Sequence, residues 1–160
     1  MNHPMDTSDE PRPEYVAMAQ ASFARIASAA EEIAWDRPVN EAGEAEEPLD
    51  VHEEVGALVY ALWHRLADAD GLLSEGERLA LERVVSGHPA YAGVISRLTA
   101  VNPPDSIPRR LLRIAAERPV TRRHLITEIE AFGYALASVD RTFDHAELDA
   151  LHGFLRDIGE

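Results

Sequence analysis

The stretch Leu66-Ala-Asp-Ala-Asp70-Gly-Leu-Leu-Ser74-Glu-Gly-Glu77 returns seventy residues later as Leu136-Ala-Ser-Val-Asp140-Arg-Thr-Phe-Asp144-His-Ala-Glu147. The agreement extends beyond this segment, because apolar residues pair with apolar residues at the same offset, as in Val59 with Ile129, Leu62 with Phe132 and Leu81 with Leu151. Self-similarity at a fixed offset, combined with helical spacing of the apolar residues, indicates two copies of one helix-loop-helix unit.

Apolar residues recur every three or four positions along most of the chain, and no stretch alternates long enough to predict a strand. Helices are predicted over 13–35, 50–70, 74–87, 89–101, 106–118, 121–140 and 144–160. The expected N-terminal caps are Asp50, Ser74, Ser106 or Asp105, Thr121 and Asp144. The sequence therefore predicts an all-α fold of about seven helices, with two similar helix-loop-helix halves related by pseudo-twofold symmetry.

Composition divides the chain into four predicted parts. Residues 1–12 are polar and are expected to be disordered, and residues 13–35 form an N-terminal helix. Residues 36–49 hold two Pro and many Glu, which is typical of an exposed acidic linker and suggests that the first helix is loosely attached. Residues 50–160 form the helical domain that carries the repeat.

The overall composition excludes several classes of function. The chain has 160 residues and no Cys, which excludes disulfides, thiolate metal sites and cysteine nucleophiles. It has neither a signal-peptide pattern nor an apolar run near the ~20 residues of a membrane span, so a soluble, cytoplasmic protein is expected. The net charge of −14 disfavours nucleic acid and favours cations or basic protein surfaces as partners.

A basic stretch interrupts this acidic background. Six Arg and only one acid, Glu117, fall between Arg109 and Arg123. Charge runs without interleaved aromatic residues are usually solvated helix faces. Docking of a partner, or of the acidic N-terminal segment, is the alternative interpretation of this stretch.

The repeated loops are the candidate cation sites. On the calcium loop of an EF-hand, Asp68 and Asp70 take ligand positions and Glu77 takes the terminal bidentate position, whereas the first ligand position falls on Leu66. The acids of the second copy are Asp140, Asp144 and Glu147. The sequence thus allows a weak Ca²⁺ or Mg²⁺ site, shared between the loops if the fold brings them together. The alternative is structural, because Ser-x-x-Glu and Asp-x-x-Glu are also capping boxes that open helices without any ligand.

Enzyme signatures are largely missing from the sequence. It contains no His-Glu-x-x-His motif, no Glu-x-x-His pair, no glycine-rich phosphate loop and no nucleophile elbow. His145, Asp149 and His152 share one helix face and are a candidate zinc or nickel cluster, although an exposed polar face is the simpler interpretation. Tyr60 and Trp63 are expected in the core, with a partner-binding role only if either is exposed.

The segment from Leu66 to Leu81, with its degenerate second copy, resembles the TerB-like domains of tellurite-resistance operons and of a membrane-anchored J-domain co-chaperone. The resemblance covers roughly residues 50–159. It implies an all-helical fold of two similar halves, acidic clusters for which divalent-metal binding has been proposed, and a partner-binding role in bacterial stress-response assemblies. This chain departs from the pattern at Ser138, Val139 and Arg141.

The functional prediction is therefore a non-enzymatic acidic adaptor of TerB-like type. It is expected to bind a partner protein, and the sequence allows a divalent cation at the Asp and Glu loops beside the capping interpretation. Two alternatives remain open, a metal-dependent enzyme that uses carboxylates from both loops and a purely structural helical domain.

Overall fold

The computed structural model describes residues 12–35, 42–43, 49–69, 75–101, 107–139 and 145–159, without the side chains of Trp35 and residues 75–77. Within these ranges the chain forms seven helices and no strand, which confirms the all-α prediction. The helices are α1 (Pro13–Trp35), α2 (Val51–Ala69), α3 (Glu75–Val85), α4 (Pro89–Val101), α5 (Arg110–Ala115), α6 (Pro119–Ser138) and α7 (His145–Gly159). Of the segment predicted to be disordered (1–12), residues 1–11 lie outside the described residues and Arg12 is described. Most of the acidic linker (36–41 and 44–48) also lies outside the described residues.

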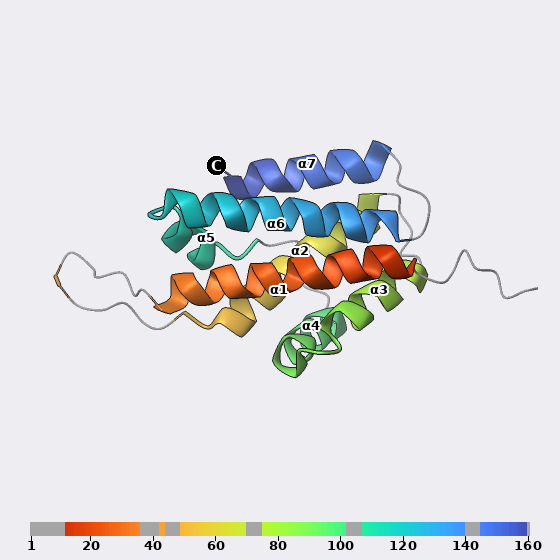
Figure 1. Ribbon diagram of the computed structural model, residues 1–160, viewed down its shortest axis with the longest axis horizontal. Coiled ribbons are helices and arrows are strands. Elements are labelled where there is room, and N and C mark those ends of the chain that lie inside the picture. The colour runs from red at the N-terminus through yellow and green to blue at the C-terminus, as the bar shows by residue number, and fades with distance from the viewer. Residues whose placement is uncertain are drawn as a thin grey trace, which may run out of the picture.

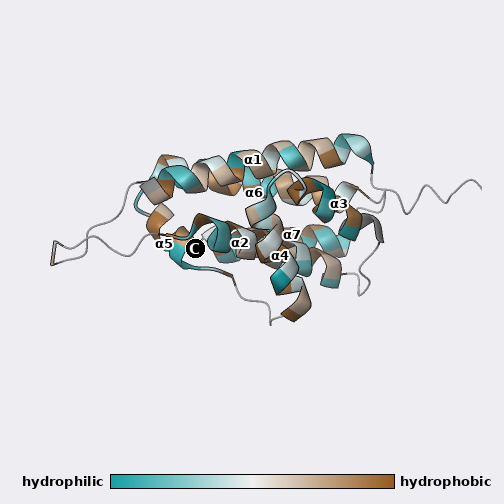
Figure 2. Ribbon diagram, turned by 90° about the horizontal axis from the view of Figure 1, so that it is seen from below, coloured by the Kyte–Doolittle hydropathy of each residue, from teal (hydrophilic) through white to brown (hydrophobic). Residues whose placement is uncertain are grey.

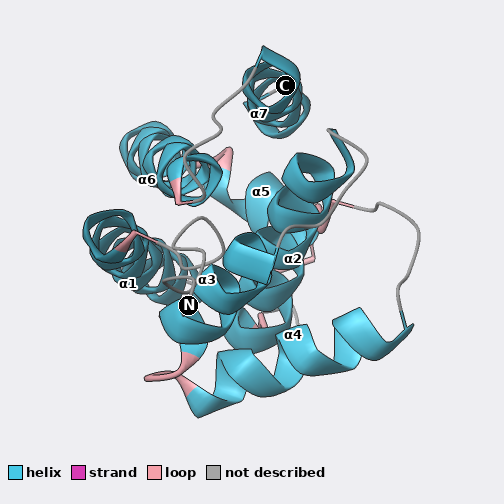
Figure 3. Cartoon of the chain, turned by 90° about the vertical axis from the view of Figure 1, so that its right-hand side faces the viewer, coloured by secondary structure: helices cyan, strands magenta, loops and turns pink. Residues whose placement is uncertain are grey.

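The long helices form a bundle (Figure 1). α1, α6 and α7 are aligned with the long axis of the molecule, and α6 runs in the opposite direction to α1 and α7. The view along the bundle places α2 beside α1 and α6, with α7 above it and α4 below it (Figure 3). Ten of the nineteen residues of α2 are buried, so α2 is the central helix of the described fold.

The helices are amphipathic, as their apolar periodicity requires. Hydrophobic and hydrophilic residues alternate along the ribbon in short blocks (Figure 2), so each helix has an inner and an outer face. The inner faces supply one contiguous core in which Phe23, Phe132 and Phe154 are completely enclosed. Tyr60 and Trp63 are also buried, which confirms the expectation that they belong to the core.

The N-terminal helix is part of the same core as the repeat region. Ala19, Phe23 and Ala30 of α1 have no exposed surface, and α1 packs along α6. The backbone N–H of Arg12 donates a hydrogen bond of 3.0 Å to the carbonyl of Val139, which joins the start of α1 to the end of α6. Helix α1 is therefore held by both apolar packing and backbone hydrogen bonding.

Helix starts follow local chemistry at most positions. α1, α4 and α6 each begin at a Pro, whose fixed φ suits the first helical residue and whose missing N–H is not needed there. The N–H of Glu53 donates to Oδ1 of Asp50 at 3.2 Å, which confirms the predicted cap of α2. The predicted cap at Thr121 is wrong, because α6 begins two residues earlier, at Pro119.

Helix α5 is shorter than the sequence predicts. It begins at Arg110, so the predicted cap at Asp105 or Ser106 is wrong, and Ile107 lies before the helix. Pro108 explains the difference, because the residue before a Pro is disfavoured in the α-helical region. The late start leaves Arg109 and Arg110 at the N-terminus of a helix of only six residues.

Two glycines allow close helix packing. A Cβ on Gly56 of α2 would lie 2.6 Å from Cγ1 of Val94 in α4, and a Cβ on Gly133 of α6 would lie 2.4 Å from Cδ1 of Leu151 in α7. Real side chains essentially never approach this closely, so these two helix pairs depend on the absence of a side chain.

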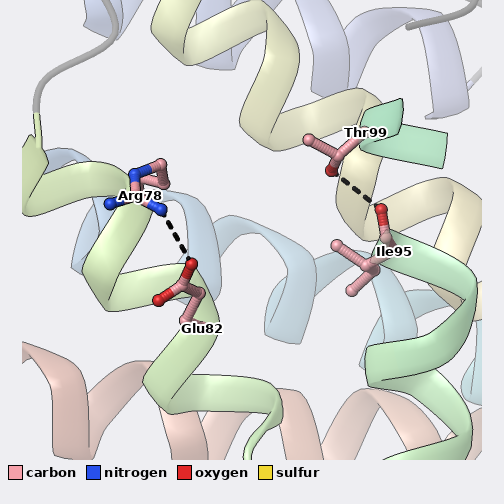
Figure 4. A network of polar contacts seen from close by, with 4 residues as sticks. All are labelled: Arg78, Glu82, Ile95 and Thr99. Carbon is pink, nitrogen blue, oxygen red and sulfur yellow. Dashed lines mark hydrogen bonds and ion pairs between the residues drawn. The ribbon is translucent and has the colours of Figure 1, made fainter. Parts of the chain in front are cut away.

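Polar contacts within single helices stabilise the shorter elements. Arg78 and Glu82 form an ion pair of 3.0 Å one turn apart on α3, and the Thr99 hydroxyl donates to the carbonyl of Ile95 at 2.8 Å on α4 (Figure 4). A pair such as Arg78–Glu82 contributes about 0.2–0.5 kcal/mol. None of the described helices combines the length and the hydropathy that crossing a membrane requires.

Candidate functional site

The two ends of the bundle carry the two candidate sites. The helix ends that flank both repeated loops, the C-termini of α2 and α6 and the N-termini of α3 and α7, lie at the right-hand end in Figure 1. The opposite end holds α5, the N-terminus of α6 and the C-terminus of α7. The helix ends that flank the repeated loops and the basic stretch are therefore at opposite ends of the bundle.

The structure describes the side chains of two of the six candidate acids of the repeated loops. Asp68 is exposed in the last turn of α2, and Glu147 is completely buried in the first turn of α7. Glu77 lies in α3, but its side chain is outside the described part, as are Asp70, Asp140 and Asp144. α3 begins directly after Ser74 and α7 directly after Asp144, where the capping boxes predict helix starts.

Glu147 occupies an unusual position for a carboxylate. Burial of a charge is costly, but the first turn of a helix carries partial positive charge that stabilises an anion. This placement suits a cap at the N-terminus of α7, and it equally suits an oxygen ligand of a cation. Cation binding by Asp68, Asp70, Glu77, Asp140, Asp144 and Glu147 stays a prediction.

The polar face of α7 does not form a metal cluster. His145, Asp149 and His152 are exposed, and Nε2 of His152 lies 3.2 Å from the hydroxyl of Tyr134 on α6. Across the described ranges, no group of three or more His, Asp or Glu side chains is arranged to hold a metal ion. The contact with Tyr134 indicates a role for His152 in joining α6 to α7.

A pocket of about 550 Å³ lies at the opposite end of the bundle. We call it the basic pocket, because four of its seven lining residues are Arg. Its lining consists of Arg109, Arg110, Arg113 and Arg122 together with Leu112, Ala116 and Ile158. The basic stretch of the sequence is thus folded around a concavity, which favours the docking interpretation over a solvated helix face. Arg118 and Arg123 belong to the same stretch but do not line the pocket.

Helix α2 fixes the α5 wall of the basic pocket. Glu54 accepts a hydrogen bond from the backbone N–H of Leu111 and lies close to the charge of Arg110. Burial raises the pKa of Glu54 above its ordinary value, and this effect outweighs the lowering by the hydrogen bond and by Arg110. A carboxylate from α2 therefore supplies the acceptor that the N-terminus of α5 needs, since Arg109 at the N-cap has none.

Helices α6 and α7 supply the other wall. The guanidinium of Arg122 donates a hydrogen bond to the carbonyl of Gly159, in the last turn of α7. This acceptor is neutral, so the contact orients the Arg122 side chain without cancelling its charge. Ile158, which is 3% exposed, adds apolar surface next to this contact.

The arrangement suits recognition of carboxylates attached to an apolar group. Guanidinium groups present planar donors that bind carboxylates in a bidentate manner. Leu112, Ala116 and Ile158 provide apolar surface between these donors. The lining of the basic pocket therefore offers donors to anionic groups and apolar surface to an apolar group.

The sequence identified the Arg residues of this site, but it did not identify Glu54 and Ile158 as residues that adjoin them. Nothing local to Glu54 or Ile158 marks them as neighbours of the basic stretch, because both come from helices distant in sequence. A scan against models of protein families, a search of curated proteins and a search of solved structures each return no match for this chain. The resemblance to TerB-like domains therefore stays a prediction.

Proposed function

We propose that this protein is a non-enzymatic adaptor that binds an acidic segment of a partner protein in the basic pocket. The observation that carries the proposal is that four Arg, from the N-cap of α5, from α5 itself and from α6, line one pocket together with apolar residues. Pockets of roughly 300–1,000 Å³ with a few placed polar groups are typical of ligand sites. A role in bacterial stress response, of the TerB-like type, rests on the sequence resemblance alone.

The local charge explains how an acidic chain can bind an acidic segment. The stretch from Arg109 to Arg123 holds six Arg and one Glu, a balance of +5 in a protein of net charge −14. At physiological ionic strength charges interact over a Debye length of about 8 Å, so a ligand in the pocket experiences mainly the nearby Arg residues. More distant acids repel extended polyanions that reach beyond the pocket.

This balance favours a short protein segment over nucleic acid. Nucleic-acid binding gains affinity from many phosphate contacts along an extended basic surface. Here the Arg residues are grouped around one pocket, while residues 1–56 hold fourteen acids and three Arg. A compact cluster of carboxylates fits the basic pocket without bringing further negative charge against the acidic remainder.

The proposal predicts that binding of an acidic peptide depends on Arg residues of the pocket. A labelled peptide Gly-Glu-Glu-Ser-Glu-Glu-Gly should bind, and Arg109→Gln/Arg113→Gln should weaken it about tenfold, since exposed ion pairs contribute up to about 1 kcal/mol each. Both residues are exposed, so the double variant should keep its thermal stability. Fluorescence anisotropy measures the dissociation constants.

The matched control is Arg123→Gln/Arg156→Gln, which removes the same charge from exposed positions outside the pocket lining. It should bind the peptide like the unaltered protein. Equal weakening by both double variants would show a response to overall charge and contradict the proposal. Tighter binding of a short single-stranded DNA than of the peptide would also contradict it.

Cation binding by the repeated loops is a separate prediction of the adaptor hypothesis. Calorimetric titration of metal-free protein with Ca²⁺ or Mg²⁺ should give saturable heat, which Asp70→Asn/Glu77→Gln abolishes by removing two carboxylate oxygens. Asp149→Asn, at an exposed position on α7, is the control. If all three proteins give no heat and the loop variant is only less stable to heating, the loops are helix caps.

A further inference from the structure

We infer that the basic pocket recognises one large apolar side chain flanked by acidic residues on both sides, within a single segment of a partner protein. The inference rests on the proposed function and adds the identity of the residue that enters the pocket. It assigns two roles to the pocket lining: the Arg side chains bind the acids, and the apolar residues contact the apolar side chain.

The apolar lining carries the first part of the inference. Leu112, Ala116 and Ile158 come from α5, from the turn after it and from the last turn of α7. Carboxylates alone would leave this apolar surface in contact with water. Burying apolar surface is the main favourable contribution to protein association, so the preferred occupant is an apolar side chain.

The positions of the Arg residues carry the second part. Arg109 and Arg113 are four residues apart, and the N–H of Arg113 donates to the carbonyl of Arg109 at 2.8 Å, so both lie on the same face of one helical turn. Arg122 lines the pocket from α6 and is held by Gly159. Positive charge therefore borders the apolar lining from two different helices, which suits acids on both sides of the apolar residue.

A central apolar residue ringed by polar contacts is the usual arrangement at strong protein interfaces. Such a residue contributes most when it enters a concave site and surrounding contacts exclude water. For a Phe side chain, burial corresponds to a gain in affinity of roughly ten- to a hundredfold. The acids then position the segment and select against neutral sequences.

The test compares two peptides on the unaltered protein and on two variants by fluorescence anisotropy. Gly-Glu-Glu-Phe-Glu-Glu-Gly should bind the full chain at least about tenfold more tightly than the Ser peptide used above. Ala116→Phe places a ring at an exposed position of the pocket lining, and it should remove the preference for Phe, so that the two peptides bind this variant with similar affinity. Ala90→Phe, at an exposed position on α4, is the matched control and should keep the preference.

The possible failures are distinguishable. Equal binding of the two peptides, with continued dependence on Arg109 and Arg113, overturns the inference about the apolar residue and leaves the proposed function standing. Absence of binding for both peptides overturns the proposed function together with the inference. Binding of decanoate that Ala116→Phe blocks, without binding of either peptide, would assign the pocket to a small amphiphilic acid instead and overturn both.

Discussion

Phe23→Ala should lower the free energy of unfolding by about 3–5 kcal/mol, which is the usual cost of removing a buried aromatic side chain. Phe23 has no exposed surface. The centre of its ring lies 5.2 Å from that of Tyr91, which it meets edge-on, and 6.2 Å from that of Phe132. These partners belong to α4 and α6, so the Phe23 side chain joins α1 to helices from two parts of the chain. Urea denaturation, followed by helical circular dichroism, measures the loss.

Met18→Ala is the control for this substitution, because Met18 lies on the same helix and is 54% exposed. Its free energy of unfolding should stay within about 0.5 kcal/mol of the unaltered protein. The comparison tests whether α1 is part of the cooperative core or an attached helix. A Phe23→Ala variant as stable as Met18→Ala would contradict the packing of α1 described above.

Gly133→Ala should destabilise the protein by about 1–3 kcal/mol, the typical cost of overpacking a core. The added methyl would lie 2.4 Å from Cδ1 of Leu151, which is fully buried and has little room to move. This cost opposes the gain of up to about 1 kcal/mol that Ala brings to an ordinary helix position. Thermal and urea unfolding measure the net effect.

Gly153→Ala, on the facing helix, provides the matched control. A Cβ at Gly153 meets nothing within 4 Å, so this variant should gain about 0.5–1 kcal/mol from helix propensity. Combining Gly133→Ala with Leu151→Ala should cost less than the sum of the single changes, because the smaller side chain removes the clash. Strict additivity would contradict the proposed contact between α6 and α7.

Much of the fold could be predicted because its determinants are local. The apolar spacing from Tyr15 to Ile33 and the Pro residues at 13 and 89 gave the observed bounds of α1 and α4. Asp50 caps α2 as expected, since an N-cap needs only an acceptor and the following amides. The late start of α5 follows from Pro108, which disfavours a helical Ile107. The acceptor at its N-terminus is Glu54, more than fifty residues earlier in the chain, which no local pattern could indicate.

The candidate site was also predictable only where its determinants are local. The density of Arg between Arg109 and Arg123 is visible in the sequence, but so is the simpler interpretation as a solvated face. Only the folded chain shows which of these side chains line a pocket, and that Arg118 and Arg123 do not. The repeated acids are equally visible in sequence, and their assignment as ligands or caps awaits the titration described above.

The sequence by itself determined the helical class, the repeated acidic sequence pattern and the segregation of charge, since periodicity, capping and net charge are properties of neighbouring residues. Only the tertiary structure decided that α1 belongs to the core and that Arg109, Arg113 and Arg122 line one pocket together with Ile158. Both outcomes depend on contacts between residues far apart in the chain. Such contacts follow from how helices pack and from where close approach is possible, as at Gly56 and Gly133.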